Sequence, residues 1–112
     1  MVTIIVQAIG GGDGFMLLDW IIQWYFSKCD GQWEHEYGVN ICTIDNPGWM
    51  VEIDILETEL EDKQFTPIEI ENSETDWLRC KVADGKFLGY GDPNKLLLIL
   101  GAFKKWYEET VY

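Results

Sequence analysis

Apolar and polar residues alternate through the middle of the chain, and this period of two predicts a β-sheet with one side facing solvent. The pattern is clearest between residues 48 and 56, where every second residue is apolar: Trp49, Val51, Ile53 and Ile55. Strand-forming segments of this kind predict strands at 37–45, 48–56, 66–71, 76–82 and 86–90. Pro67 near the start of the third segment favours an edge position or the beginning of a strand.

A spacing of three to four residues between apolar positions predicts a helix on either side of these strands. In the first helix, at 16–29, one face carries Leu17, Trp20, Ile21, Trp24 and Tyr25. Further apolar residues extend around this helix: Phe15, Leu18, Ile22 and Phe26. We therefore expect it to be buried on more than one side. In the second helix, at 93–109, one face carries Leu96, Ile99, Leu100, Phe103, Trp106 and Tyr107.

The order helix, five strands, helix predicts an α+β fold. In this fold an antiparallel sheet of about five strands, arranged as a meander, is flanked by an N-terminal and a C-terminal helix packed on one face. Gly31 is expected to take a left-handed conformation after the first helix. Asp92 is expected to be the N-cap of the second helix, with Pro93 as its first residue. Between the first two strands, residues 45–48 have the composition of a tight turn in which Gly48 accepts a positive φ.

The first fifteen residues differ from the rest of the chain. Residues 2–9 are good strand formers, and the glycine-rich residues 10–14 after them are expected to hold no regular structure. Codons for Gly-Gly-Asp can spell a bacterial ribosome-binding sequence, and Met16 lies just downstream. We therefore predict that residues 1–15 are a non-native or flexible N-terminal extension and that residues 16–112 form a single domain. A genuine edge strand at 2–9 is the alternative.

Acidic residues dominate the charge, with 20 Asp and Glu against 8 Lys and Arg and a formal net charge of −12. Such a chain repels nucleic acid phosphates and anionic lipids, so we expect neither nucleic acid nor a membrane as partner. It favours a basic protein partner, although acidity that only maintains solubility explains the composition as well. Three widely spaced cysteines, the lack of a secretory signal and the lack of a membrane-spanning stretch predict a reduced, cytoplasmic protein.

The acidic residues cluster in one part of the sequence. Ten of them fall between positions 52 and 76: Glu52, Asp54, Glu57, Glu59, Glu61, Asp62, Glu69, Glu71, Glu74 and Asp76. In the third strand Ile68 and Ile70 are predicted to face inward, with glutamates between them facing outward. We expect the carboxylates to project together from the solvent-facing side of the strands at 48–56 and 66–71, where a basic partner would relieve their mutual repulsion. The predicted partner-binding residues are Glu34, Glu36, Glu52, Asp54, Glu57, Glu59, Glu61, Asp62, Glu69, Glu71 and Glu74.

The single histidine, His35, belongs to two candidate catalytic groupings. Glu34-His35-Glu36 resembles a metal site, but in an extended segment the two glutamates share a face and His35 points away. The absence of a second histidine also excludes a His-rich zinc site. Cys29 and His35 would form a nucleophilic pair, but no recognised motif surrounds Cys29. We therefore predict no metal site and no catalytic residue in these groupings, and keep a thiol-dependent enzyme using Cys29 and a general acidic interaction module as alternatives.

Several short motifs are distributed over the chain from residue 16 onward. They are Trp33-Glu34-His35-Glu36-Tyr37-Gly38, Thr43-Ile44-Asp45-Asn46-Pro47-Gly48-Trp49, Glu57-Thr58-Glu59-Leu60, Ile68-Glu69-Ile70-Glu71, Asp76-Trp77, Gly89-Tyr90-Gly91, and Trp20 with Trp24-Tyr25. Together they resemble the Imm53-type bacterial immunity proteins. The Asp-Asn-Pro-Gly-Trp turn is a fairly specific part of this resemblance.

The resemblance implies a small cytosolic α+β protein, encoded beside a polymorphic toxin, that binds and neutralises that toxin. It implies neither catalysis nor a cofactor. The expected partner is a basic toxin domain, for instance a nuclease whose phosphate-binding cleft the carboxylates would occupy.

Overall fold

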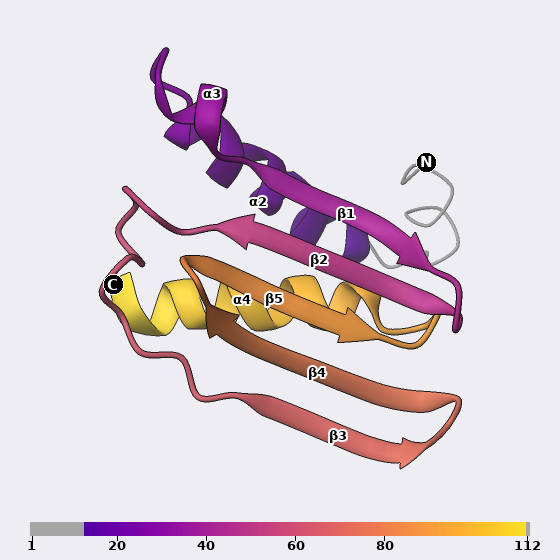
Figure 1. Cartoon of the computed structure of the whole chain (residues 1–112). Coiled ribbons are helices and arrows are strands. Elements are labelled where there is room, and N and C mark those ends of the chain that lie inside the picture. Colours follow the sequence, from indigo (N-terminus) through magenta and orange to yellow (C-terminus); the bar gives the residue numbers. More distant parts are fainter. Residues whose placement is uncertain (1–12, 112) are drawn as a thin grey trace.

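The structure is a computed structural model that describes residues 13–111. The helices are α2 (Asp13–Lys28), α3 (Trp33–Glu36) and α4 (Leu96–Val111). The strands are β1 (Val39–Ile44), β2 (Gly48–Asp54), β3 (Ile68–Ser73), β4 (Asp76–Ala83) and β5 (Lys86–Gly91). Figure 1 shows that the five strands form one twisted sheet and that α2 and α4 lie behind it, on the same face. Within the described part of the chain, the opposite face carries no helix, and we refer to it as the open face.

The strands are ordered β1-β2-β5-β4-β3, and every neighbouring pair is antiparallel. The predicted five-stranded antiparallel sheet with two flanking helices is confirmed, but the strand order is not that of a simple meander. Two-residue turns at 74–75 and 84–85 join β3, β4 and β5 as consecutive hairpins. The connection at 55–67 is too long for a hairpin and leads to the far edge of the sheet (Figure 1), so β5 is the second neighbour of β2.

The register of the sheet gathers the core residues on the helix side. Val51 of β2 lies opposite Gly89 of β5, which in turn lies opposite Cys80 of β4. Ile53 lies opposite Phe87 in the same way. Apolar residues with at most 1% exposure form the centre of the core: Val51, Ile53, Ile55, Leu60, Cys80, Phe87, Ile99, Leu100 and Phe103. The predicted apolar face of the 48–56 segment is therefore confirmed.

The edge strand β3 is only partly covered. Its register places Ile68 opposite Cys80 and Ile70 opposite Leu78, so both isoleucines lie on the helix side as predicted. Ile70 is nevertheless 40% exposed, because β3 lies at the outer edge of the sheet. The edge position that Pro67 favours is confirmed.

Gly89 allows α4 to lie directly on the centre of the sheet. A Cβ atom at this position would be 2.3 Å from Cγ2 of Ile99, a residue of α4. Phe103 of α4 then contacts both layers, with its ring centroid 5.2 Å from that of Phe87 in β5 and 5.0 Å from that of Trp24 in α2. The C-terminal helix is therefore the element through which α2 is fixed to the sheet.

The C-terminal helix begins later than predicted, because residues 92–95 form a separate turn. The amide of Lys95 donates to the carbonyl of Asp92 (3.0 Å), and α4 begins only after this turn. The fully buried carboxylate of Asp92 accepts hydrogen bonds from the amides of Trp77 (2.8 Å) and Asn94 (2.9 Å) and from Nζ of Lys95 (2.7 Å). Burial favours a raised pKa for Asp92, but these donors outweigh it and lower the pKa. Asp92 thus links β4 to the turn and is not the N-cap of α4.

The predicted turns after the first helix and between the first two strands, and the predicted start of the first helix, agree only in part with the structure. Gly31 has a φ of +94° after α2, as predicted. Gly48 does not have a positive φ; the Asn46–Pro47 peptide is cis, and a Cβ atom on Gly48 would be 2.3 Å from the carbonyl oxygen of Gly91. The helix α2 includes residues 13–15, which the sequence assigns to an extension. The predicted strand at 2–9 lies outside the described residues.

Candidate partner-binding surface

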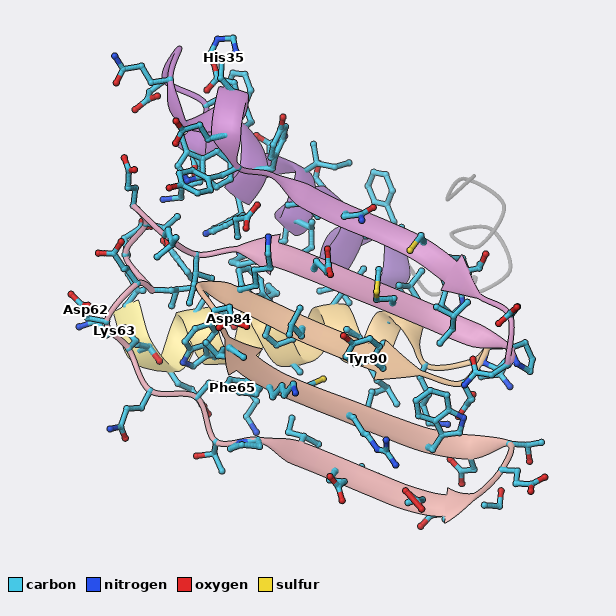
Figure 2. The ribbon with its side chains drawn as sticks, viewed as in Figure 1. His35, Asp62, Lys63, Phe65, Asp84 and Tyr90 are labelled. Carbon is cyan, nitrogen blue, oxygen red and sulfur yellow. The ribbon has the colours of Figure 1, made fainter. Side chains whose placement is uncertain are left out.

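The acidic residues of β2 and β3 lie on the same face of the sheet but not beside one another. The strand order places β5 and β4 between them, so Glu52 and Asp54 are separated from Glu69 and Glu71 across the open face. Figure 2 shows Tyr90 of β5 in the middle of this face. The expectation that these carboxylates project together is therefore wrong, because it assumed that β2 and β3 are neighbours.

Basic residues of the intervening strands pair with the acidic residues of the open face. Nζ of Lys86 lies 2.7 Å from Oδ1 of Asp54, and this hydrogen bond raises the pKa of Lys86. Nη2 of Arg79 lies 2.6 Å from Oε1 of Glu71. Partly exposed ion pairs contribute little stability, but they cancel charge locally. The open face therefore carries charges of both signs.

Six of the eleven predicted binding residues lie at one end of the molecule, on α3 and on the connection between β2 and β3. They are Glu34, Glu36, Glu57, Glu59, Glu61 and Asp62, and we refer to them as the acidic end. Figure 2 shows Asp62 at the outer edge of the connection and His35 on α3, pointing away from the sheet. The glutamate of the β3–β4 turn, Glu74, is exposed and lies apart from this group.

Tryptophan side chains fix the connection in place. Nε1 of Trp33 donates to the carbonyl of Leu56 (3.0 Å), and Nε1 of Trp106 donates to the carbonyl of Gln64 (2.8 Å). Between these two points Leu60 is fully buried in the core. The connection contains neither helix nor strand, yet these anchors give its carboxylates defined positions.

The carboxylate of Glu34 already accepts hydrogen bonds from the local backbone. Residues 33–36 form a short helix, so the extended conformation in which His35 points away from the two glutamates is not present. The helix directs the Glu34 carboxylate back to the preceding loop, where it accepts the amides of Asp30 (2.9 Å) and Gly31 (2.8 Å). Hydrogen bonds from backbone amides, that of Glu34 itself first, lower the pKa of this carboxyl.

Glu59 and Glu61 also make contacts within the protein. Glu59 accepts hydrogen bonds from Nζ of Lys28 in α2 and from the hydroxyl of Tyr107 in α4 (3.2 Å). Partial burial favours a raised pKa for Glu59, but the hydrogen bonds from Lys28, from its own backbone amide and from Tyr107, with the charge of Lys28, together lower the pKa. Oε1 of Glu61 accepts the amide of Glu57 (3.0 Å). Glu59 therefore fixes the connection to α2 and α4, and Glu61 stabilises the backbone within the connection.

Glu36 and Glu57 border a shallow hollow of about 410 Å³. Its lining consists of Asp30, Gly31, Gln32, Trp33, His35, Glu36, Tyr37 and Glu57. Burial and the neighbouring carboxylates of Glu57 and Glu36 raise the pKa of Tyr37, whose hydroxyl lies 3.4 Å from Oε2 of Glu57. Glu57 has a φ of +60°, a conformation that residues other than glycine seldom adopt. The hollow has the size and charge to receive a lysine or arginine side chain.

The geometry around Cys29 does not assemble a nucleophilic pair. Its thiol donates to the carbonyl of Tyr25 (3.4 Å), and among residues 13–111 no hydrogen bond joins it to His35. In the same range, no three His, Cys, Asp or Glu residues lie close enough together to hold a metal ion.

None of the helices described is both long and apolar enough to cross a membrane.

The outer side of α2 is a feature that sequence reasoning missed. Leu18 is buried as expected, but Phe15, Ile22 and Phe26 are 58%, 59% and 72% exposed. The expectation that this helix is buried on more than one side is therefore wrong for these residues. The exposed positions share one side of the helix, and this spacing was the available signal.

The comparisons with known proteins give one family. The sequence profile described as immunity protein 53, Imm53, matches residues 18–108, which is most of the chain. Searches of curated proteins and of solved structures returned no significant match. The match includes the whole sheet, α3, most of α2 and most of α4. The chain belongs to the immunity protein 53 family.

Proposed function

We propose that this protein is a cytoplasmic immunity protein that binds a cognate toxin domain of a bacterial polymorphic toxin system and neutralises it through the acidic end. The toxin domain is basic, for instance a nuclease, and the carboxylates occupy its phosphate-binding cleft. The family match over residues 18–108 is the observation that carries this proposal. The acidic end is the part of the predicted surface that remains grouped in the fold.

The charge distribution supports a basic partner. The net charge of −12 attracts a basic domain over distances of about 10 Å at moderate salt, which speeds association. At the acidic end, Glu36, Glu57 and Asp62 are exposed and form no salt bridge with any described residue. These three carboxylates are therefore available to pair with lysine and arginine side chains of a toxin.

The first experiment tests whether the protein neutralises a toxin. The toxin domain encoded by the adjacent gene is expressed in a bacterial host with and without this protein, and growth and co-purification are measured. The proposal expects that growth is restored and that the two chains purify together. Unimpaired toxicity in the presence of soluble, folded protein would contradict it.

The second experiment tests the surface with variants of equal net charge. Glu36→Lys with Glu57→Lys changes two exposed carboxylates at the acidic end, whereas Asp45→Lys with Glu74→Lys changes two exposed carboxylates in the β1–β2 and β3–β4 turns. Both double variants reduce the negative charge by four units. The proposal expects only the first to weaken toxin binding by more than about tenfold and to reduce its salt dependence. Equal effects of the two would show that the position of the charge is unimportant.

The alternative of a thiol-dependent enzyme makes an opposite prediction for Cys29. Cys29→Ser retains a small polar side chain and removes the nucleophile. The immunity function is expected to survive this change, because the thiol only donates to the carbonyl of Tyr25. Loss of toxin neutralisation with retained folding would favour the enzyme.

A further inference from the structure

Exposed large apolar residues are concentrated on the outer side of α2. Phe15, Ile22 and Phe26 are separated by seven and four residues, so they lie above one another on one side of the helix. The side chains of Ile21 and Trp24, which point to the core, are at most 5% exposed. Contiguous exposed apolar patches rimmed by polar residues mark sites of interaction with a partner.

The helix presents this stripe on a fixed support. Trp20 packs edge-to-face on Phe103 and Tyr107 of α4, with centroid distances of 6.1 and 5.3 Å. Trp24 packs in the same manner on Trp33, with a distance of 6.1 Å. A partner that binds α2 therefore meets a surface that is already ordered, which lowers the entropic cost of binding.

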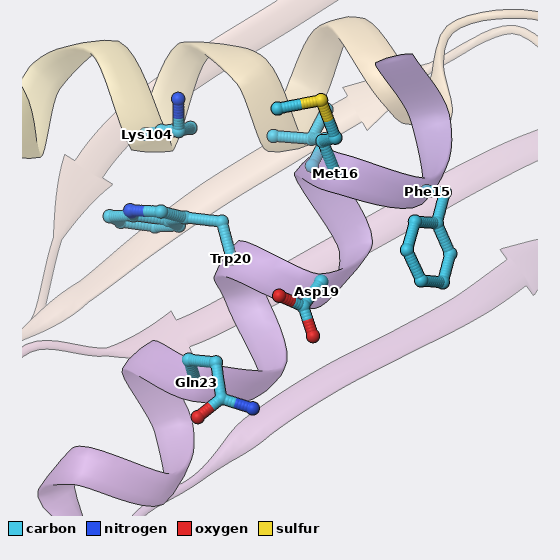
Figure 3. A pocket seen from close by; sticks show the side chains of 7 residues that line it. Phe15, Met16, Asp19, Trp20, Gln23 and Lys104 are labelled. Atoms are coloured by element: carbon cyan, nitrogen blue, oxygen red, sulfur yellow. The ribbon is translucent and has the colours of Figure 1, made fainter. Parts of the chain in front are cut away.

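A hollow of about 480 Å³ adjoins the N-terminal half of the stripe. It lies between α2 and α4 and is lined by Phe15, Met16, Leu17, Asp19, Trp20, Gln23 and Lys104. Figure 3 shows Met16 and Trp20 directed toward Lys104 of α4, with Asp19 on the outer side of the helix. An apolar stripe beside a hollow matches the anatomy of interface hot spots, where large side chains of the partner enter pockets.

The charges around the stripe favour a basic partner over a second copy of this chain. Asp19 is exposed and lies on the same side of the helix as Ile22 and Phe26. Asp30 follows α2 closely in the sequence. Tyr25 of α2 contacts Trp33 of α3, so the C-terminal end of α2 also lies beside the acidic end. Two copies would bring net charges of −12 together, whereas a basic surface is attracted.

We propose that the outer side of α2, formed by Phe15, Ile22 and Phe26, is the apolar part of the toxin-binding surface and contacts an apolar patch with a basic rim on the toxin. This inference rests on the proposed function and extends it. The acidic end steers association, and the stripe on α2 supplies most of the affinity after contact.

The test uses the full chain and the purified toxin domain encoded by the adjacent gene. Ile22→Ser with Phe26→Ser removes two of the three apolar side chains of the stripe. Leu98→Ser is the matched control, because Leu98 is 58% exposed and lies on α4 instead. Phe26→Lys is a second variant that repels a basic partner without removing the isoleucine. Thermal unfolding verifies that each variant is folded, and calorimetry gives Kd.

The stripe variants are expected to raise Kd at least about 30-fold, whereas Leu98→Ser changes it less than threefold. Unchanged affinity of both stripe variants, while the unaltered chain binds, would overturn this inference and leave the immunity function intact. Failure of the unaltered chain to bind would overturn both. Sedimentation of the unaltered chain as a dimer that the stripe variants dissociate, with unchanged toxin affinity, would assign the stripe to a second copy instead.

Discussion

Gly89→Ala tests the close contact between α4 and the sheet. The added methyl group would lie 2.3 Å from Cγ2 of Ile99 and 3.5 Å from Cε2 of Phe87. Carbon atoms in contact prefer about 3.5–4.0 Å, so the helix or the side chain must move by more than about 1 Å. Both neighbours are fully buried, and the β-branched side chain of Ile99 has few alternative rotamers in a helix.

The expected cost is a loss of about 3 kcal/mol in the free energy of unfolding, at the upper end of the range for overpacked cores. For a domain whose total stability is about 5–15 kcal/mol, this is a large fraction. Removing the opposing side chain should relieve the clash. Ile99→Ala alone costs about 2–4 kcal/mol through the cavity that it leaves. In that background, Gly89→Ala is expected to cost at least about 1.5 kcal/mol less than it does alone.

Urea unfolding followed by tryptophan fluorescence measures these free energies. Gly38→Ala serves as the control, because a Cβ atom on Gly38 has no heavy atom within 4 Å and should change stability by less than about 0.5 kcal/mol. The reasoning is refuted if Gly89→Ala is as mild as Gly38→Ala. It is also refuted if the costs of Gly89→Ala and Ile99→Ala simply add.

Two further predictions concern single carboxylates. Asp92→Asn removes the buried carboxylate that pairs with Lys95, while Lys95 keeps its ion pair with Asp76 (2.8 Å), and should cost about 2 kcal/mol at pH 7. Because the folded state lowers the pKa of Asp92 from 3.8, the stability that its carboxylate contributes is present above about pH 4 and is lost as the pH falls below that value. The variant should therefore lose less stability than the unaltered protein on acidification, which denaturant titrations between pH 3 and 7 would measure. Glu57→Gly removes the strain of a φ of +60° and should raise the free energy of unfolding by about 0.5–1 kcal/mol while weakening toxin binding. Urea unfolding measures the first effect and calorimetry the second, and a loss of stability or an unchanged Kd would contradict this prediction.

Local patterns predicted the elements, and long-range pairing decided their arrangement. The alternation around Val51 and Ile53 correctly identified a strand and its buried face. The choice of β5 as its neighbour depends on contacts between segments far apart in sequence, which periodicity does not encode. Gly89 and Gly91 make β5 a weak strand by propensity, yet small residues are what permit α4 to lie above the centre of the sheet.

The candidate surface was predictable only in part for the same reason. The acidic connection was visible in the sequence, and its carboxylates stay together because they are close along the chain. Those of β2 and β3 were grouped by an incorrect strand order. For α2, apolar residues on more than one side of the helix predict burial of Ile22 and Phe26, but the pattern does not show which side faces the core, and both residues are exposed.

The proposed immunity function requires that this member of the immunity protein 53 family bind its toxin directly. Calorimetric titration of the purified toxin domain encoded by the adjacent gene into the full chain tests it most directly. We expect a 1:1 complex with a Kd at or below about 10 nM that weakens as salt is raised. The absence of heat and of co-elution at micromolar concentrations, with both proteins folded, would contradict it.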